Sequence, residues 1–300
     1  QVFKGLWAIF DFKNTLQLKT TILVHCPDQA GIISTVTGFI HRNQGNIVYL
    51  DQHVDKPANV FFMRTVVEFE DDLSDLEHFK TLFQKELATP YNMEWSLHTD
   101  DKLPKMAIFV SKYNHCLYDL LSRYQSGEMA VEIPFILSNH NDLKYIADQF
   151  DIPFFHVPFT KANKVAAEQE QIAILEKYNV DFIVLARYMQ IVSGTLIDKY
   201  PNKIINIHHS FLPAFAGAKP YHAAFKRGVK IIGATSHYVT EELDAGPIIE
   251  QDVTTVTHSH SIEDFITKGR DLEKIVLSRG VKLHIARKTM VYNNKTVIFS

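Results

Sequence analysis

The sequence predicts an α/β chain with two domains, a small N-terminal domain and a larger, doubly wound domain. Over residues 18–100, strand and helix patterns follow one another in the order βαββαβ. Beyond residue 104, short β-branched runs alternate with helical patterns, which is typical of a mostly parallel sheet. The polar stretch 100–104 ends in a proline and predicts the boundary, so we expect domains over 18–100 and 104–300.

The N-terminal elements follow from period-2 and period-3.6 apolar patterns separated by Gly, Pro and Asn. They are a strand over 18–25, a turn over 26–32, a helix over 33–41, a strand from Gly45, a break at 56–59, a strand over 60–69, a helix over 75–87 and a strand over 91–97. This order is that of a ferredoxin-like domain. Residues 2–12 are apolar but carry no signal-peptide pattern, and we assign residues 1–17 no element.

The second domain is predicted in the same way. Its strands are expected over 105–110, 129–137, 154–157, 181–186, 203–208 and 295–299, and its helices over 116–125, 142–150, 162–178, 194–200 and 262–286. In a parallel sheet, ligands bind beyond the carboxyl ends of the strands. The strand over 203–208 ends in Asn206 and His208, so these polar side chains are expected at that edge.

Asn206 and His208 are two residues apart on a strand and therefore project in the same direction. An amide beside an imidazole can hydrogen-bond a carbonyl oxygen and the oxyanion that forms from it. Asp244 adds a carboxylate from a separate loop, which Gly246 and Pro247 punctuate. The three side chains predict a site for acyl chemistry at one reacting atom.

This pattern of Asn206, His208 and Asp244 resembles the folate-dependent formyltransferase family over roughly residues 104–300. The resemblance implies a 10-formyltetrahydrofolate substrate and a catalytic role for these three residues. It also implies a substrate-binding role for a segment that lines the pterin pocket through backbone groups and for two residues before the Asp244 loop. These residues are Arg187, Tyr188, Met189, Gln190, Ile191, His237 and Val239. In the family, a histidine at the place of His237 orients the aspartate or a water.

The formyl acceptor is predicted from departures from the family pattern. The turn after the first strand of this domain, 110–121, lacks the glycines that hold a phosphate in members acting on a ribonucleotide. Residues 208–215, 217–222 and 233–240 resemble the members whose acceptor is water, above all through His209, where other members usually have proline. Ser236 replaces a usual alanine. The resemblance therefore implies hydrolysis to formate and tetrahydrofolate, which supplies one-carbon and purine metabolism.

Two alternatives stay open at this point. The formyl group is passed to a small amine instead of water, or the chain is an amino-acid sensor with a decayed catalytic domain. Retention of all three candidate catalytic residues argues against the sensor.

The turn from Asp28 to Ile32, between a strand and a helix, resembles the ACT domain, a regulatory module that usually binds amino acids between paired copies. The resemblance implies an amino-acid effector and a homodimer or homotetramer. Gly31 allows close backbone approach, and free amides at the helix start can hold a carboxylate. Asp28 and Asn46 are candidates to meet the ammonium group. The alternative is that Asp28 only caps the helix and the domain only mediates assembly.

Composition sets further bounds. The 300 residues are 46% hydrophobic, and no apolar run approaches the length of about 20 residues that spans a bilayer. A net charge of −3 does not favour a nucleic-acid partner. We expect a soluble, cytoplasmic protein with a small-molecule substrate. A folate glutamate tail still needs a cation, and Lys161, Lys164 and Arg187 are equal candidates.

Cysteines and histidines offer little further chemistry. Cys26 and Cys116 fall in different predicted domains, so we expect no disulfide and a reducing compartment. Cys116 follows His115, but adjacent residues rarely aim at each other, so a thiol nucleophile is disfavoured. His258 and His260 lack partners at suitable spacing for a metal site. We therefore expect no bound metal and no cofactor other than the folate substrate itself.

Overall fold

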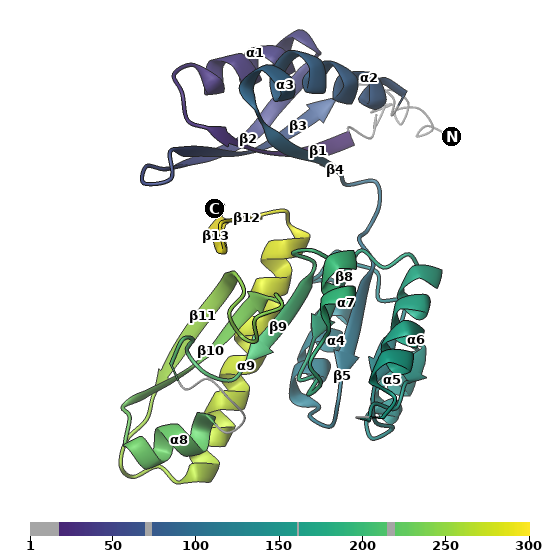
Figure 1. Cartoon of the computed structure of the whole chain (residues 1–300), viewed down its shortest axis with the longest axis vertical. Coiled ribbons are helices and arrows are strands. Elements are labelled where there is room, and N and C mark those ends of the chain that lie inside the picture. The colour runs from purple at the N-terminus through teal and green to yellow at the C-terminus, as the bar shows by residue number, and fades with distance from the viewer. Residues whose placement is uncertain (1–17, 70–73, 161, 215–219) are drawn as a thin grey trace, which may run out of the picture. The chain divides into compact units, whose positions relative to one another are not determined.

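The structure is a computed structural model of the whole chain and describes residues 18–69, 74–160, 162–214 and 220–300. The chain divides into two compact units between Lys102 and Leu103 (Figure 1). The structure does not describe residues 1–17, 70–73, 161 and 215–219, which include the glutamate-tail candidate Lys161. Each unit is described by itself.

The N-terminal unit is a four-stranded antiparallel sheet in the order β2-β3-β1-β4. Apolar side chains of α1 and α2, including Phe39 and Phe79, pack on one face of this sheet and form its core. The elements are β1 (Leu18–Pro27), α1 (Ile32–Arg42), β2 (Gly45–Asp55), β3 (Val60–Phe69), α2 (Ser74–Phe83), a π-helical turn (Gln84–Ala88), α3 (Thr89–Tyr91) and β4 (Glu94–Thr99). The predicted βαββαβ order is confirmed.

The last helix and strand of this unit differ from the predicted bounds. The helical backbone continues through Tyr91, where the sequence predicted the start of a strand. Asn92 adopts a left-handed conformation, with φ of 55°, and ends the helix. The strand therefore starts at Glu94, because a strand pattern read from alternation alone does not show where the preceding helix stops.

The second unit contains a seven-stranded sheet in the order β11-β10-β9-β8-β5-β6-β7. Pairings from β9 through β8, β5 and β6 to β7 are parallel, whereas β10 pairs antiparallel with β9 and with β11. The strands are β5 (Met106–Val110), β6 (Ile136–Ser138), β7 (Phe154–His156), β8 (Phe182–Leu185), β9 (Ile204–His208), β10 (Ile231–Tyr238) and β11 (Ile248–Thr255). The mostly parallel, α/β fold is confirmed.

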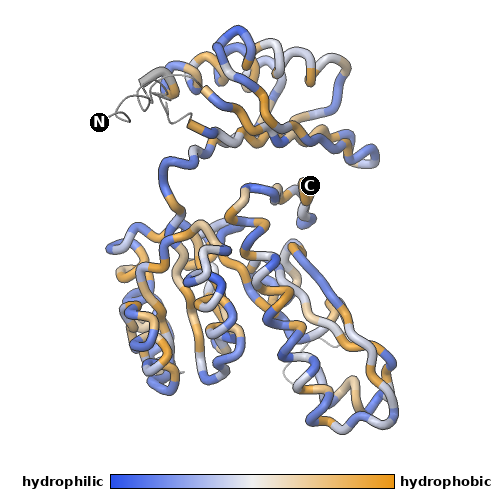
Figure 2. Tube along the Cα trace, turned by 180° about the vertical axis from the view of Figure 1, so that it is seen from behind, coloured by the Kyte–Doolittle hydropathy of each residue, from blue (hydrophilic) through white to orange (hydrophobic). Residues whose placement is uncertain are grey.

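Helices cover both faces of this sheet, and the parallel strands contribute side chains alternately to the two cores. In β5, Ile108 packs with α4, α5 and α9, and Phe109 packs with α6 and α7. Figure 2 shows the resulting apolar strands between helices with hydrophilic outer turns. The helices are α4 (His115–Gln125), α5 (Lys144–Gln149), α6 (Lys164–Lys177), α7 (Gly194–Lys199), α8 (Pro220–Arg227) and α9 (Ile262–Ile285).

Two parts of this unit were not predicted correctly. The strand expected over 129–137 is wrong for most of its length, since only β6 (Ile136–Ser138) is a strand. Pro134 has no N–H for a ladder, and before it only Glu132 makes an isolated bridge, to Lys105. The sequence patterns did not predict α8, β11 or β12 (Thr289–Tyr292). The strand expected over 295–299 is present as β13 (Lys295–Ile298). Among the described helices, none is long and apolar enough to cross a membrane.

Candidate active site

A cavity of about 290 Å³ opens at the carboxyl ends of β8 and β9. It collects residues from three separate segments: the loop after β8, the end of β9, and β10 with the loop that follows it. Its lining is Leu185, residues 187–192, residues 206–209, His237, residues 239–241, Leu243 and Asp244. Every substrate-binding and catalytic residue predicted for the second domain lines this one cavity.

The buried His208 and the partly buried Asp244 form a pair at the cavity wall. The imidazole Nδ1 of His208 lies 3.2 Å from Asp244 Oδ2. This hydrogen bond, opposed by partial burial, lowers the pKa of Asp244 below its ordinary value. His208 Nε2, at the opposite side of the ring, is buried and has no hydrogen-bond partner among the residues that the structure describes. An orphaned donor or acceptor in a ligand cavity is a point at which a ligand can bind.

Asn206 is oriented by His237 on the neighbouring strand. The two residues are cross-strand partners, and Asn206 Nδ2 lies 3.1 Å from His237 Nε2. His237 Nδ1 is 2.9 Å from the carbonyl oxygen of Tyr238, so Nδ1 carries the proton and Nε2 accepts from the amide. Burial lowers the pKa of His237, which keeps this acceptor neutral at pH 7. One amide hydrogen of Asn206 is thus fixed, and the other is left for a ligand.

The loop that carries Asp244 is shaped by close backbone contact. Asp244 has a φ of 56°, a conformation that Asp tolerates better than most residues. A Cβ on Gly246 would lie 1.8 Å from the carbonyl oxygen of Tyr238, so only glycine fits there. The predicted need for glycine in this turn is confirmed. His237 Nε2 is 3.8 Å from Asp244 Oδ1, so the carboxylate of Asp244 lies close to both His208 and His237.

The segment after β8 is held in place by hydrogen bonds from buried polar side chains of neighbouring elements. Ser111 Oγ accepts a hydrogen bond from Met189 N (2.9 Å) and donates to Asn139 Oδ1 (2.7 Å). Gln171 donates to the hydroxyl of Tyr188 (2.9 Å), and burial raises the pKa of Tyr188 to about 12. Glu168, buried on α6, accepts from both the amide and the hydroxyl of Ser193. These contacts hold the backbone of 187–193 against the cavity, while the side chains of Met189 and Ile191 remain exposed.

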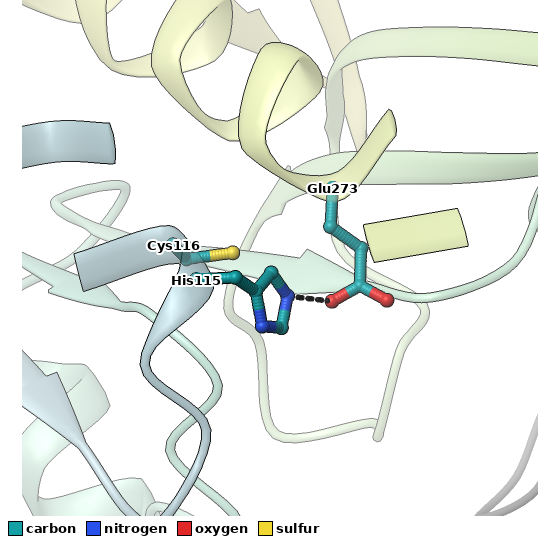
Figure 3. A group of neighbouring side chains, drawn as sticks. All are labelled: His115, Cys116 and Glu273. Atoms are coloured by element: carbon teal, nitrogen blue, oxygen red, sulfur yellow. Dashed lines mark hydrogen bonds and ion pairs between the residues drawn. The ribbon is translucent and has the colours of Figure 1, made fainter. Parts of the chain in front are cut away.

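Figure 3 shows a second cluster, formed by His115, Cys116 and Glu273, which contacts the cavity-lining residue Arg187 through Glu273. No sequence pattern indicated Glu273 as a member of it. Glu273 on α9 is 1% exposed and accepts from Tyr221 (2.6 Å) while its other oxygen lies 2.8 Å from His115 Nε2 and 3.4 Å from Arg187 Nε. Burial opposes ionisation of Glu273, but His115 and Arg187 outweigh it and lower its pKa. The Arg187 guanidinium also lies over the ring of Tyr113, 4.8 Å from its centroid.

His115, Cys116 and Glu273 are also the one group among the described residues with ligand atoms close enough for a metal ion. Both Glu273 oxygens already accept hydrogen bonds or ion pairs, and a guanidinium beside them opposes a cation. The thiol of Cys116 is fully buried, which raises its pKa well above the ordinary value. The cluster is therefore a structural ion-pair network and not a thiolate nucleophile. His260 lies in the loop before α9, where its Nδ1 accepts a hydrogen bond from the backbone N–H of Thr257 (2.8 Å).

Removing the Glu273 carboxylate is expected to destabilise the second unit strongly. Glu273→Ala leaves the buried guanidinium of Arg187 without its anion, a change that typically costs about 3–5 kcal/mol. Thermal unfolding followed by circular dichroism should show a lower midpoint. Glu128→Ala removes an exposed carboxylate that pairs with Lys282 and should have a much smaller effect. Equal midpoints for the two variants would contradict this role of Glu273.

The ACT-site prediction is not met within one chain. Asn46 pairs with Glu68, which pairs with Lys19 at the start of β1, whereas Asp28 follows the end of β1. Asn46 therefore lies at the end of the sheet where β1 starts, and Asp28 lies at the end where β1 stops. The nine residues from Lys19 to Asp28 separate these two ends of the sheet by roughly 30 Å. The prediction that Asp28 and Asn46 meet one ammonium is therefore wrong for a single copy, because pairing register and not sequence proximity sets their places. Glycine is favoured at position 31 by its φ of 93°, and a Cβ built there would clash with no neighbouring atom. No side chain caps the start of α1, so Asp28 does not cap this helix.

Fold and site together define a member of the formyl transferase class with an attached ACT domain. The formyl transferase family model matches residues 104–281, and the ACT domain model matches residues 20–84. The formyltetrahydrofolate deformylase of Synechocystis sp. is 51% identical over 94% of this chain and 99% of its own length, and that of Bacillus subtilis is 42% identical over 97% of each. The chain belongs to the formyltetrahydrofolate deformylase family.

Solved structures agree with this assignment. A formyltetrahydrofolate deformylase from Pseudomonas syringae superposes with a TM-score of 0.90 at 41% identity, and the match covers 97% of this chain and 96% of that one. Glycinamide ribonucleotide transformylase 1 from Symbiobacterium toebii matches 68% of this chain and 98% of its own, with a TM-score of 0.63 and 26% identity. The deformylase structure thus spans both units, whereas the transformylase matches a smaller part.

Proposed function

We infer that this protein hydrolyses 10-formyltetrahydrofolate to formate and tetrahydrofolate. The observation that carries the inference is the His208–Asp244 pair beside Asn206, with His208 Nε2 buried in the cavity wall and hydrogen-bonded to no described residue. The full-length similarity to deformylases supports water as the acceptor over a small amine. The intact geometry of the three residues also disfavours a sensor with a decayed catalytic domain.

In the proposed reaction, Asp244, His208 and Asn206 act on the formyl group. A water held by Asp244 Oδ1 attacks the formyl carbon and gives its proton to that carboxylate. The new oxyanion accepts hydrogen bonds from His208 Nε2–H, in the protonated ring, and from the free amide hydrogen of Asn206. Asp244 Oδ2 holds the imidazolium through Nδ1. The carbon–nitrogen bond then breaks, the folate nitrogen takes the proton from Asp244, and formic acid leaves and loses its proton to solvent as formate.

The folate is proposed to lie along the loop after β8. Backbone groups of 187–191 are positioned by the contacts of Ser111, Gln171 and Glu168, and the cavity also includes Val239. The guanidinium of Arg187 is already engaged with Glu273, and Lys164 is exposed outside the cavity lining. Arg187 is therefore proposed to shape the cavity and not to hold the glutamate tail. We propose the folate as substrate and no further cofactor.

The two units are proposed to divide regulation from catalysis, over 18–100 and 104–300. An ACT domain typically binds amino-acid effectors. Because Asp28 and Asn46 lie at opposite ends of the sheet in one copy, a shared effector site would need both from different copies. We propose a homodimer or homotetramer on this ground. Both cysteines are free and buried, which supports the proposal of a reducing, cytoplasmic compartment.

The proposed function is tested by supplying 10-formyltetrahydrofolate with water as the only acceptor. Formate and tetrahydrofolate should appear in equal amounts, and an added amine such as an amino sugar should neither speed turnover nor become formylated. Substrate binding without turnover, or turnover that needs an amine, would contradict hydrolysis.

As the pH falls, the rate should first decline because His237 becomes protonated. Its pKa lies below the ordinary 6.5, so the rate should hold as the pH falls through 6.5 and decline below it, when a proton on Nε2 removes the acceptor for Asn206. Asp244 protonates later, because its pKa lies below 3.8. His237→Gln retains an acceptor that does not titrate and should move the limb to lower pH. Initial rates corrected for the enzyme-free reaction would show this, and an unmoved limb would contradict it.

A further inference from the structure

The C-terminal hairpin of β12 and β13 reaches back to the loop that carries Asp244. The side-chain amide of Asn294 donates a hydrogen bond to the carbonyl oxygen of Ala245 (2.9 Å), the residue directly after Asp244. The formyl transferase family model ends at residue 281, so the hairpin lies beyond the matched core. A segment outside that core thus contacts the loop that carries the candidate catalytic residue Asp244.

The hairpin also contacts the other end of the same loop. The hydroxyl of Thr289 in β12 lies 2.8 Å from the hydroxyl of Tyr238, which is also 2.8 Å from His284 Nδ1. Tyr238 directly follows His237, and its backbone accepts from His237 Nδ1 and donates to the carbonyl of Pro247 (2.9 Å). The loop over 239–247 is therefore held by the hairpin at both of its ends.

The hairpin has a regular register and a defined two-residue turn. Tyr292 pairs with Lys295, which leaves Asn293 and Asn294 as the turn residues. Their φ angles of 46° and 58° are those of a type I′ turn, for which Asn is favoured because it tolerates the left-handed region. This turn fixes the direction of the Asn294 side chain toward Ala245. The hydrogen bond is exposed, so its role is to select a loop conformation and not to stabilise the fold.

We propose that the hairpin is a positioning element that holds the Asp244 loop in its active conformation, with Asn294 as the positioning residue. Asp244 itself sits at a φ of 56°, a conformation that persists only where neighbouring contacts impose it. Without Asn294, the loop samples conformations in which Asp244 leaves His208. This proposal rests on the proposed role of Asp244 in hydrolysis.

The test compares Asn294→Gly with Asn293→Gly in the full chain. Glycine suits both positions of a type I′ turn, so each variant retains the hairpin, but only the first removes the bond to Ala245. We expect Asn294→Gly to lower kcat about threefold to tenfold, the range that corresponds to one hydrogen bond. Asn293→Gly should retain the wild-type kcat, and the two thermal midpoints should agree. Asn294→Asp retains the turn but replaces the donor, and should lower kcat at least as much.

The acid limb of kcat gives a readout that a merely structural role would not move. Both variants are therefore measured in a His237→Gln background, in which His237 no longer titrates and the Asp244 limb becomes visible. As Asp244 leaves His208, its pKa returns toward the ordinary value, so the Asp244 limb should move to higher pH in Asn294→Gly but not in Asn293→Gly. His208, His237 and His209 are the titratable groups whose charges act on Asp244, and none of them is changed by either variant. Asp244→Asn is assayed in parallel. If it is inactive while Asn294→Gly retains the wild-type kcat and acid limb, the positioning role is wrong. If Asp244→Asn retains activity, the role of Asp244 itself is wrong.

Discussion

Asp244→Asn is expected to reduce kcat for hydrolysis of 10-formyltetrahydrofolate by about 10²–10⁴, the usual contribution of a general acid–base group. Asparagine tolerates the left-handed backbone of this position, whose φ is 56°, so the loop should retain its shape. The change removes the carboxylate that takes the water proton and the negative charge beside His208. Release of formate and tetrahydrofolate measures the loss.

Glu242→Gln is the matched control for Asp244→Asn. Glu242 is exposed in the same loop and does not line the cavity, so this exchange of a carboxylate for an amide should leave kcat unchanged. A rate for Asp244→Asn within about threefold of the wild type would exclude Asp244 as the acid–base group.

Asn206→Ala is expected to lower kcat by about 10²–10³, the typical cost of one oxyanion donor. The KM for the folate should change far less, because the oxyanion exists only in the transition state. The thermal midpoint serves as the control for folding, since Asn206 is only partly buried. A rise in KM with kcat unchanged would place Asn206 in ground-state binding and not in catalysis.

The double variant of Asn206→Ala and Asp244→Asn tests whether the two residues act on one step. Groups that act as a unit show losses that do not multiply. We expect the double variant to be less impaired than the product of the two single losses. Losses that multiply fully would indicate that the two residues serve independent steps.

Much of the fold followed from local patterns. Alternation gave β5 and β9 within one residue of their observed starts, and the helical period gave α4 and α9 almost completely. Elements without a periodic signal were missed. The short helix α8 begins at Pro220, directly after the segment 215–219, and β12 is only four residues long. The strand predicted over 129–137 was wrong for most of its length, because the apolar run around Pro134 resembles a strand in sequence although most of it does not pair.

The candidate site was predicted in its membership but not in its interactions. Asn206, His208 and Asp244 line one cavity with the segment 187–191, as expected. The partner of His237 proved to be Asn206, at 3.1 Å, while Asp244 pairs with His208. The buried carboxylates of Glu168 and Glu273 had no sequence signal, because a glutamate within a helix usually faces solvent.

By itself, the sequence determined the elements, their α/β order and the strand-end placement of Asn206 and His208, because these depend on residues a few positions apart. Only the tertiary structure decided which distant groups meet. The register of β1, β2 and β3 separated Asp28 from Asn46, and the return of the C-terminal hairpin brought Asn294 to Ala245. Such contacts depend on how whole elements pack, and a hydrogen bond between residues tens of positions apart leaves no local pattern in the chain.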